Sequence, residues 1–288
     1  MCIRDRSRLL ADPLSGGAPS DLSRDAADEG WYWAAGECVA RDALPFAEMQ
    51  AQWQSLVHVL RRERVEVVFV DGESGGRFCS FTRDPAIAVK GGAIVGRLPA
   101  ATRRGEQRWV SQALARLGMP VLRTVSGTGL MEGGSFTWVD PTCAAIGRSN
   151  CVNEEGARQV EQVLQSQGVE VLRVDLSFAE IHLDGVFAMV AEGLALADVA
   201  RLPYRFLERL AERDIGVIPL GEADDRWIVN CLVVRPGLVL MPEGISGATL
   251  DVLHGHGLKV AILPFDKVHV NGGGIRCSTC PLIRDPMS

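Results

Sequence analysis

One pattern recurs five times along the chain and limits the folds it can adopt: a helical stretch, a turn, then a short strand. Each helical stretch has apolar residues spaced three and four apart, and each strand has the bulky β-branched residues of a buried strand. Successive copies are separated by about 43 to 54 residues, counted from one leading leucine to the next. These leucines are Leu60, Leu114, Leu164, Leu210 and Leu253.

A period of this length is typical of repeated supersecondary units, but the αβ units of an ordinary doubly wound sheet recur about as often. Recurrence alone therefore leaves both α/β folds open. No low-complexity linker divides the 288 residues, which predicts a single domain with one substantial core.

The N-terminal residues stand apart from this pattern. Residues 1–7 lack periodicity and resemble a translated adapter, so we interpret them as an artefactual tail and assign the domain to residues 8–288. The Ser-, Asp- and Gly-rich segment from Pro13 to Gly30 predicts a loop over the surface or over the functional site.

Composition disfavours several classes of function. The formal net charge of −6 argues against a nucleic-acid partner, which needs a basic face. The run from Arg61 to Arg64 contains a glutamate and predicts a solvated helix end. No apolar run approaches the ~20 residues of a membrane span; the most apolar stretch, Cys231–Met241, predicts two strands around a turn. Eight cysteines without a secretory signal indicate free thiols in a reducing cytoplasm.

Four stretches carry polar groups that their settings do not require. Asp84 lies in Phe81-Thr-Arg-Asp-Pro85, and Glu132 stands before a Gly pair. His182 and Asp184 are expected to share one face of a strand. Cys277 follows three glycines near the C-terminus. Taken singly, each has an ordinary explanation. Asp84 could be a turn former, Glu132 a loop carboxylate, His182 a core histidine and Cys277 an inert thiol.

The spacing of Cys277 and Cys280 also matches half of a zinc site or a redox dithiol. A structural zinc site needs four ligands, but the chain has no second Cys-x-x-Cys, and the nearest histidines lack finger-like spacing. A thioredoxin-like dithiol should open a helix near the start of a βαβ unit, whereas Pro281 follows the second cysteine here. We therefore interpret Cys280 as a buried neighbour that packs behind the site.

Taken together, the cysteine, histidine and carboxylates are what attack on a guanidinium carbon requires. A guanidinium remains protonated and offers a planar fork of N–H donors, which carboxylates on two sides can hold. Its carbon is a poor electrophile, so the nucleophile should be a thiolate. A histidine oriented by a glutamate can then protonate the departing amine and activate water.

These four stretches, in this order, resemble the motifs of the guanidino-group-modifying enzymes. This superfamily includes arginine deiminase, dimethylarginine dimethylaminohydrolase, agmatine deiminase and the arginine amidinotransferases. The resemblance runs from about Trp31 to the C-terminus and implies a pentein fold, a fivefold pseudosymmetric α/β propeller that would form one catalytic domain. It also implies the following roles: Cys277 as the nucleophile of a covalent amidino-cysteine intermediate, His182 with Glu132 as general acid and base, and Asp84 and Asp184 as guanidinium ligands.

The resemblance is closest to arginine deiminase, because the dimethylarginine enzymes usually lack the second Asp. It implies a deiminase that acts on arginine or a related guanidino compound, releases ammonia and needs no metal or organic cofactor. An amidinotransferase, a dimethylarginine dimethylaminohydrolase-like enzyme, a hydrolase that yields ornithine directly, and a pentein that only binds its ligand remain alternatives. A small-molecule guanidino substrate is the expected partner, and a homo-oligomer is compatible with the sequence.

The chain departs from the deiminases at the end of the site that would hold the amino-acid tail. Ser135 and Cys151 stand where those enzymes usually have an Asp and a carboxylate-binding Arg. Arg103, Arg148 and Arg276 are alternative ligands for a substrate carboxylate, and a solvated surface role is an equal alternative for each. Free arginine is therefore less firmly predicted as the substrate than the chemistry is.

Overall fold

Four copies of one ββαβ unit dominate the structure, a computed structural model that describes residues 45–70, 81–100 and 103–283. In each unit two strands form an antiparallel hairpin, a helix follows, and the third strand pairs parallel to the second. The units are β1 Ala86–Val89, β2 Gly92–Val95, α3 Glu106–Arg116 and β3 Val121–Thr124; β4 Phe136–Asp140, β5 Cys143–Arg148, α4 Glu154–Ser166 and β6 Glu170–Asp175; β7 Phe187–Ala191, β8 Leu194–Ala197, α5 Tyr204–Ala211 and β9 Gly216–Pro219; and β10 Leu232–Arg235, β11 Leu238–Pro242, α6 Gly247–Gly255 and β12 Lys259–Leu263.

Local sequence signals explain the boundaries of these elements. Glycines with positive φ close hairpins, as at Gly193 between β7 and β8 and Gly237 between β10 and β11. The side chain of Asn153 accepts a hydrogen bond from the Gly156 amide and begins α4, and Ser246 caps α6 in the same way. Short 3₁₀ turns occupy Gly133–Ser135, Leu183–Gly185, Val199–Arg201 and Arg226–Val229. Two α-helices lie outside the four units: α2 Phe46–Arg62 and α7 Asp266–His269.

The recurring helix–turn–strand pattern is confirmed in four of its five copies. All five leading leucines lie in the last turns of helices and are buried. The strands that follow four of them are β3, β6, β9 and β12. The first leucine lies in α2, but residues 65–70 after that helix form no strand. The two strands predicted within Cys231–Met241 are β10 and β11.

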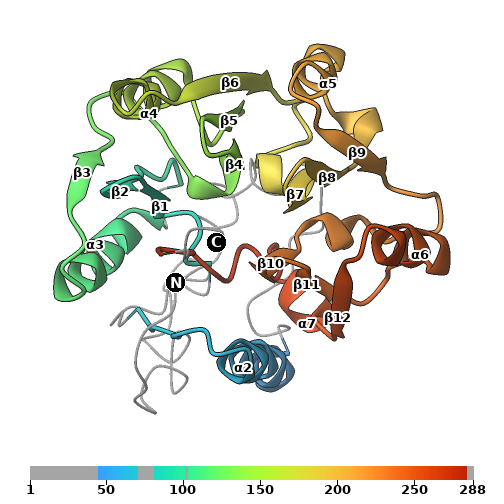
Figure 1. Cartoon of the computed structure of the whole chain (residues 1–288). Coiled ribbons are helices and arrows are strands. Elements are labelled where there is room, and N and C mark those ends of the chain that lie inside the picture. The colour runs from blue at the N-terminus through green and yellow to red at the C-terminus, as the bar shows by residue number, and fades with distance from the viewer. Residues whose placement is uncertain (1–44, 71–80, 101–102, 284–288) are drawn as a thin grey trace.

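Apolar clusters join each unit to the next rather than filling a single central core. Ile94 and Phe136 belong to one cluster between the first and second units, and Phe187 and Val139 to another between the second and third. A further cluster joins the third and fourth units, and α2 packs against the fourth. Figure 1 shows the four sheets and α2 arranged around a central region. The fold is thus mixed α/β, with four small sheets rather than one doubly wound sheet.

Some predictions fall partly or wholly outside these residues. The described part of the chain contains four sheets, so the expected fivefold propeller is not confirmed by them. The proposed tail at residues 1–7 and the loop from Pro13 to Gly30 lie outside the described residues. The solvated helix end is confirmed, because α2 ends at Arg62 with exposed arginines. None of the described helices combines the length and the apolar character needed to cross a bilayer.

Candidate active site

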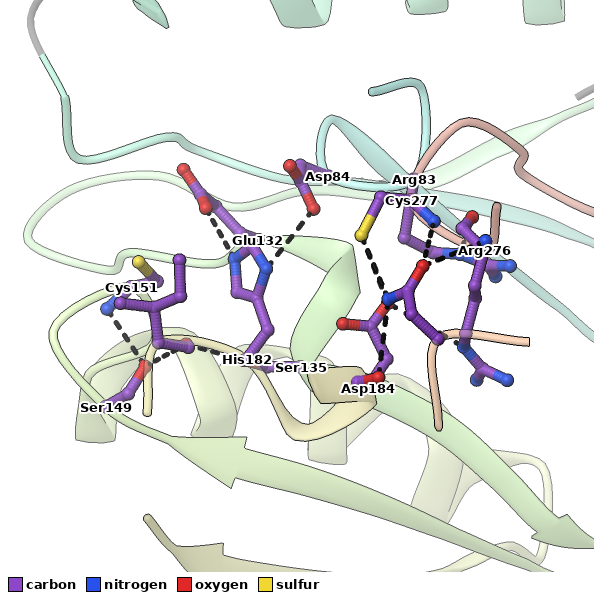
Figure 2. A network of polar contacts seen from close by, with 12 residues as sticks. Arg83, Asp84, Glu132, Ser135, Ser149, Cys151, His182, Asp184, Arg276 and Cys277 are labelled. Carbon is purple, nitrogen blue, oxygen red and sulfur yellow. Dashed lines mark hydrogen bonds and ion pairs between the residues drawn. The ribbon is translucent and has the colours of Figure 1, made fainter. Parts of the chain in front are cut away.

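Four of the five polar residues singled out from the sequence occupy equivalent places, just before the first strand of successive units. Asp84 lies just before β1, Glu132 precedes the 3₁₀ turn that leads into β4, and His182 and Asp184 flank Leu183 just before β7. Cys277 follows α7 near the C-terminus. All five side chains are buried, and Figure 2 shows them side by side in one network. The segments that enter the first strand of each unit therefore build the site.

The expected strand position of His182 and Asp184 is wrong. The two residues lie in and beside a 3₁₀ turn, and β7 begins only at Phe187. The turn has a physical cause: Gly185 follows directly, and its amide donates a hydrogen bond back to the carbonyl of His182. Both side chains still reach the site: Figure 2 shows His182 beside Asp84 and Asp184 beside Cys277.

His182 is held between two carboxylates. Its Nε2 lies 2.7 Å from Oε2 of Glu132, and its Nδ1 lies 3.8 Å from Oδ1 of Asp84. Burial lowers the pKa of His182, but Asp84, Cys151 and Glu132 outweigh it and raise that pKa well above the ordinary value. The free site therefore favours an imidazolium, which can donate a proton to a leaving group.

Gly134 makes this arrangement possible. A Cβ on this residue would lie 2.5 Å from Nδ1 of His182 and 2.9 Å from Oδ1 of Asp84. No side chain can occupy that space without moving one of the two groups. The second glycine of the Glu-Gly-Gly stretch is thus required by the close approach of the backbone to the imidazole.

Cys277 is positioned by a side chain that the sequence reasoning did not single out. The amide of Asn230 donates through Nδ2 to Sγ of Cys277 at 3.1 Å, and its Oδ1 accepts from the backbone N–H of Cys277 at 3.2 Å and of Arg276 at 3.0 Å. A Cβ on Gly274 would lie 2.5 Å from that Oδ1, so the glycine run admits the amide. The signal for Asn230 was positional: like Asp84, it stands two residues before the first strand of its unit.

Two carboxylates face the thiol. Oδ2 of Asp184 lies 3.9 Å from Sγ of Cys277, and Oδ1 of Asp84 is buried without a hydrogen-bond partner among the described residues. Burial, then Asp184 and Asp84, raise the pKa of Cys277 to about 12. Burial also raises the pKa of Asp184, although His182 and Arg276 oppose it. The site is therefore buried and lined by carboxyl groups, and these surroundings favour the protonated thiol of Cys277.

Arg103 lies behind the carboxylates. Its guanidinium forms a bidentate pair with Glu106, at 3.0 and 2.8 Å, and donates to Oδ2 of Asp84 at 2.9 Å. Its Nη1 also lies 3.7 Å from Oε1 of Glu132. This buried arginine orients two site carboxylates, a role different from the carboxylate-binding role expected from the sequence.

The remaining predicted tail-binding groups are also engaged with the protein. Arg148 is half-exposed at the end of β5 and pairs with Asp175 and Glu154. Arg276 donates to Oγ1 of Thr137 at 2.9 Å, and its Nε lies 3.7 Å from Asp184.

The two side chains that stand where the deiminases usually have an Asp and an Arg are buried. Ser135 and Cys151 are both fully buried, and Ser135 donates to the carbonyl of Ile181. Cys280 is buried as expected, with its thiol donating to the Ala86 carbonyl behind the site. The five cysteines in the described part of the chain are free thiols.

The chain is similar to several known proteins. The family model for N,N dimethylarginine dimethylhydrolase, eukaryotic, matches residues 46–284. An N(G),N(G)-dimethylarginine dimethylaminohydrolase of Streptomyces coelicolor is 28% identical over 64% of this chain and 72% of its own. An arginine deiminase of Oenococcus oeni is 23% identical over 71% of this chain, and the match spans 60% of that enzyme.

The fold is shared with a solved structure of a related enzyme. Dimethylarginine dimethylaminohydrolase from Pseudomonas aeruginosa, in a complex with citrulline, has a TM-score of 0.71 at 24% identity, covering 82% of this chain and 88% of that one. The family model extends over most of the chain and includes every site residue described above. The chain therefore belongs to the family described as N,N dimethylarginine dimethylhydrolase, eukaryotic, within the superfamily of guanidino-group-modifying enzymes.

Proposed function

We propose that this chain is a cysteine-dependent hydrolase that attacks the guanidinium carbon of arginine or a related guanidino compound and leaves a ureido product. The observation that carries the proposal is the buried Oδ1 of Asp84, which has no hydrogen-bond partner among the described residues and lies beside Asp184 and Cys277. A buried carboxylate oxygen without a donor is costly. A guanidinium bound there would supply charged N–H donors to both carboxylates.

The substrate's own charge can activate the nucleophile. Burial and the two carboxylates keep Cys277 protonated in the free site. A bound guanidinium neutralises the carboxylates and favours the thiolate, so the thiolate forms mainly when an electrophile is in place. Asn230 keeps its N–H donor 3.1 Å from the sulfur and can stabilise the anion as it forms.

The reaction then proceeds in two balanced steps. As the guanidinium binds, the Cys277 thiol loses its proton to solvent. The thiolate then adds to the guanidinium carbon, the His182 imidazolium transfers a proton to one nitrogen, and that nitrogen leaves as the amine with formation of an amidino-cysteine. In the second step His182, now neutral, takes a proton from water as the water attacks the same carbon. The C–S bond breaks, and the ureido product and the thiol are released. Glu132 orients the imidazole through Nε2 in both steps.

Two groups of substrates fit the site for different reasons. Two buried carboxylates favour an unsubstituted guanidinium, as in arginine, from which ammonia would leave. The matched family favours dimethylarginine, from which dimethylamine would leave. Ser135 and Cys151 are neutral, so they offer no charged partner to an amino-acid tail. We therefore propose the guanidino group as the recognised element and leave the tail to experiment.

A product screen tests the proposal. The purified chain is supplied with arginine, agmatine, guanidino acids and methylated arginines, with and without an acceptor amine, and the products are measured by mass spectrometry. A ureido product with ammonia or dimethylamine supports hydrolysis, ornithine with a new guanidino compound supports amidino transfer, and ornithine with ammonia supports a dihydrolase. Cys277→Ser should abolish turnover in a folded protein; a fully active serine variant, or no turnover of any compound, would contradict the proposal.

We also propose that α2, residues 65–70 and the C-terminal segment form a fifth unit of a pentein. Val65, Val67 and Phe69 pack with Cys277 in the cluster that faces the fourth unit. Val70 packs with Cys280 in the cluster of the first unit. These contacts place the segment between the fourth and first units, where a fifth blade would close the ring. A crystal structure in which residues 65–70 pair as a strand would support this assignment.

A further inference from the structure

Arg276, the residue before the proposed nucleophile, is fixed by contacts with all four units. Its backbone N–H donates to Oδ1 of Asn230 at 3.0 Å, at the entry to the fourth unit. Its carbonyl accepts from Nε of Arg83 at 3.4 Å, at the entry to the first. Its guanidinium donates to Oγ1 of Thr137 at 2.9 Å in the second unit, and its Nε lies 3.7 Å from Oδ2 of Asp184 at the entry to the third. The charge of Arg276 is therefore held in one place beside Asp184.

The carboxylate of Asp184 needs a cation because it is buried. Asp184 is 2% exposed, and the oxygen that faces Arg276 also lies 3.9 Å from Sγ of Cys277. A buried carboxyl group without a nearby cation takes up a proton instead of keeping its charge. Figure 2 shows Arg276 and Asp184 on the same side of the network as Cys277.

Several charged groups around Asp184 act on it in opposite directions. Burial raises the pKa of Asp184, and Asp84 adds to this effect. Three cations oppose it: His182, Arg276 and Arg83. His182 gives up its proton during the proposed reaction, whereas an arginine keeps its charge at every working pH. Arg276 is the arginine at ion-pair distance from the carboxylate.

We propose that Arg276 is a positioning residue that acts through Asp184: its guanidinium keeps that carboxylate charged and in place for the guanidinium of the substrate. A charged carboxylate forms stronger hydrogen bonds with a guanidinium than a neutral carboxyl group does. Thr137 holds the other end of the Arg276 side chain, so that Nε faces Asp184. The consequence for substrate binding rests on the proposed function, whereas the link between Arg276 and Asp184 does not.

Chemical denaturation at about pH 5 and about pH 8 tests this link without any ligand. A carboxyl group with a raised pKa in the folded protein stabilises the fold at low pH, and this contribution is lost as the pH rises through the folded pKa. Arg276→Gln removes the cation and should raise the pKa of Asp184 further. The ratio of the unfolding equilibrium constant of the variant to that of the wild type should therefore be at least about tenfold larger at the higher pH.

Three comparisons isolate the charge. Arg276→Lys retains a cation, so its effect on unfolding should be the same at both pH values. In the Asp184→Asn background, Arg276→Gln should also have the same effect at both, because no carboxyl group titrates there. Arg97→Gln is the control for loss of an arginine: Arg97 is partly buried in the first unit and donates to the carbonyl of Gly129 at 3.3 Å.

An effect of Arg276→Gln that is equal at both pH values would overturn the proposal, as would a pH-dependent effect that persists in Asp184→Asn. If Arg276→Gln alone does not fold, the double variant with Asp184→Asn decides. It should fold because both members of the ion pair are gone, and its failure to fold would also overturn the proposal.

Binding of guanidino probes measures the consequence for the site. Cys277→Ser, with and without Arg276→Gln or Arg276→Lys, is titrated with arginine and with agmatine by calorimetry at about pH 6 and about pH 9. Arg276→Gln should raise the Kd at least about tenfold at the lower pH and by less than about threefold at the higher, where Asp184 ionises without help. Arg276→Lys should stay within about threefold at both. Equal weakening at both pH values would overturn the action through Asp184. If Cys277→Ser alone binds neither probe, the proposed function fails, and the denaturation result still decides the link between Arg276 and Asp184.

Discussion

Replacing Asn230 by alanine tests how the thiol is positioned. The buried amide spans the site: Nδ2 donates to Sγ of Cys277 at 3.1 Å and to the carbonyl of Asp184 at 3.3 Å. Its Oδ1 accepts from two consecutive backbone amides, those of Arg276 and Cys277. Asn230→Ala thus removes a side-chain amide that touches both Cys277 and the segment carrying Asp184.

The structure sets the size of the expected effects. The backbone N–H of Cys277 loses this acceptor, whereas that of Arg276 keeps the Asn230 carbonyl, so the free energy of unfolding should fall by about 1–3 kcal/mol. The sulfur also loses its donor and the constraint on its position. A displacement of about 1 Å at a reacting atom can cost about 100-fold in rate. We therefore expect kcat to fall about 100-fold while KM changes little.

The assay separates positioning from stability. The control is Asp224→Ala, because Asp224 also accepts from two backbone amides, those of Gly221 and Ser246, in the same unit. Both variants are compared by chemical denaturation, by kcat and KM, and by the pH profile of Cys277 alkylation. The control should lose stability and keep its kcat and alkylation profile, whereas Asn230→Ala should alter all three.

A folded Asn230→Ala variant with a kcat within about threefold of the wild type and an unchanged alkylation profile would refute the role of Asn230 in positioning the Cys277 thiol. Asn230→Asp gives a second check. It retains a carboxylate oxygen as acceptor but replaces the donor at Nδ2 by an anion beside Sγ, which should raise the pKa of Cys277 further. Slower alkylation at neutral pH than in the wild type is the expected result.

Three further predictions concern charge and space in the site. Because burial and two carboxylates raise the pKa of Cys277 to about 12, its alkylation by iodoacetamide should accelerate about tenfold per pH unit from neutral to alkaline pH, and a plateau near neutral pH would contradict this. Arg103→Met leaves Asp84 and its neighbouring carboxylates without their shared cation, so the free energy of unfolding should fall by about 3–5 kcal/mol in chemical denaturation. The control Arg148→Met removes a half-exposed arginine and should lower the free energy of unfolding by at most about 1 kcal/mol. Gly134→Ala should lower kcat at least about tenfold by displacing the imidazole of His182, and an unaffected kcat would show that the ring can move aside.

Most of the fold could be predicted from the sequence because its signals are local. Helix amphipathicity and β-branched strands reveal the helix–strand half of each unit, and the leading leucines mark the ends of five helices. The antiparallel hairpin that opens each unit was less visible. Its strands are only four to six residues long and nearly all buried, as in β2 and β8, so they lack the alternation that identifies a half-exposed strand.

The site was predicted to the extent that its residues carry unusual chemistry for their settings. A glutamate before two glycines and a histidine among apolar residues are conspicuous in a sequence, and the structure brings both to Cys277. Asn230 was not conspicuous, because a neutral amide before a strand is ordinary in composition. The role of Arg103 depended on Glu106 and Asp84, three and nineteen residues away, and only folding brings those charges together.

The repeated unit explains why such a site can be assembled from distant segments. Each ββαβ unit presents the entry to its first strand toward the centre of the molecule, so one short segment per unit contributes to a common site. The first unit supplies Asp84, the second Glu132, the third His182 with Asp184, and the fourth Asn230. Since each segment is anchored by its own sheet, a residue can change in one segment while the others keep their geometry. Cys151 lies in a different segment, between β5 and α4, and places a buried thiol beside Glu132 and His182, while Asp184 lies 3.9 Å from Cys277.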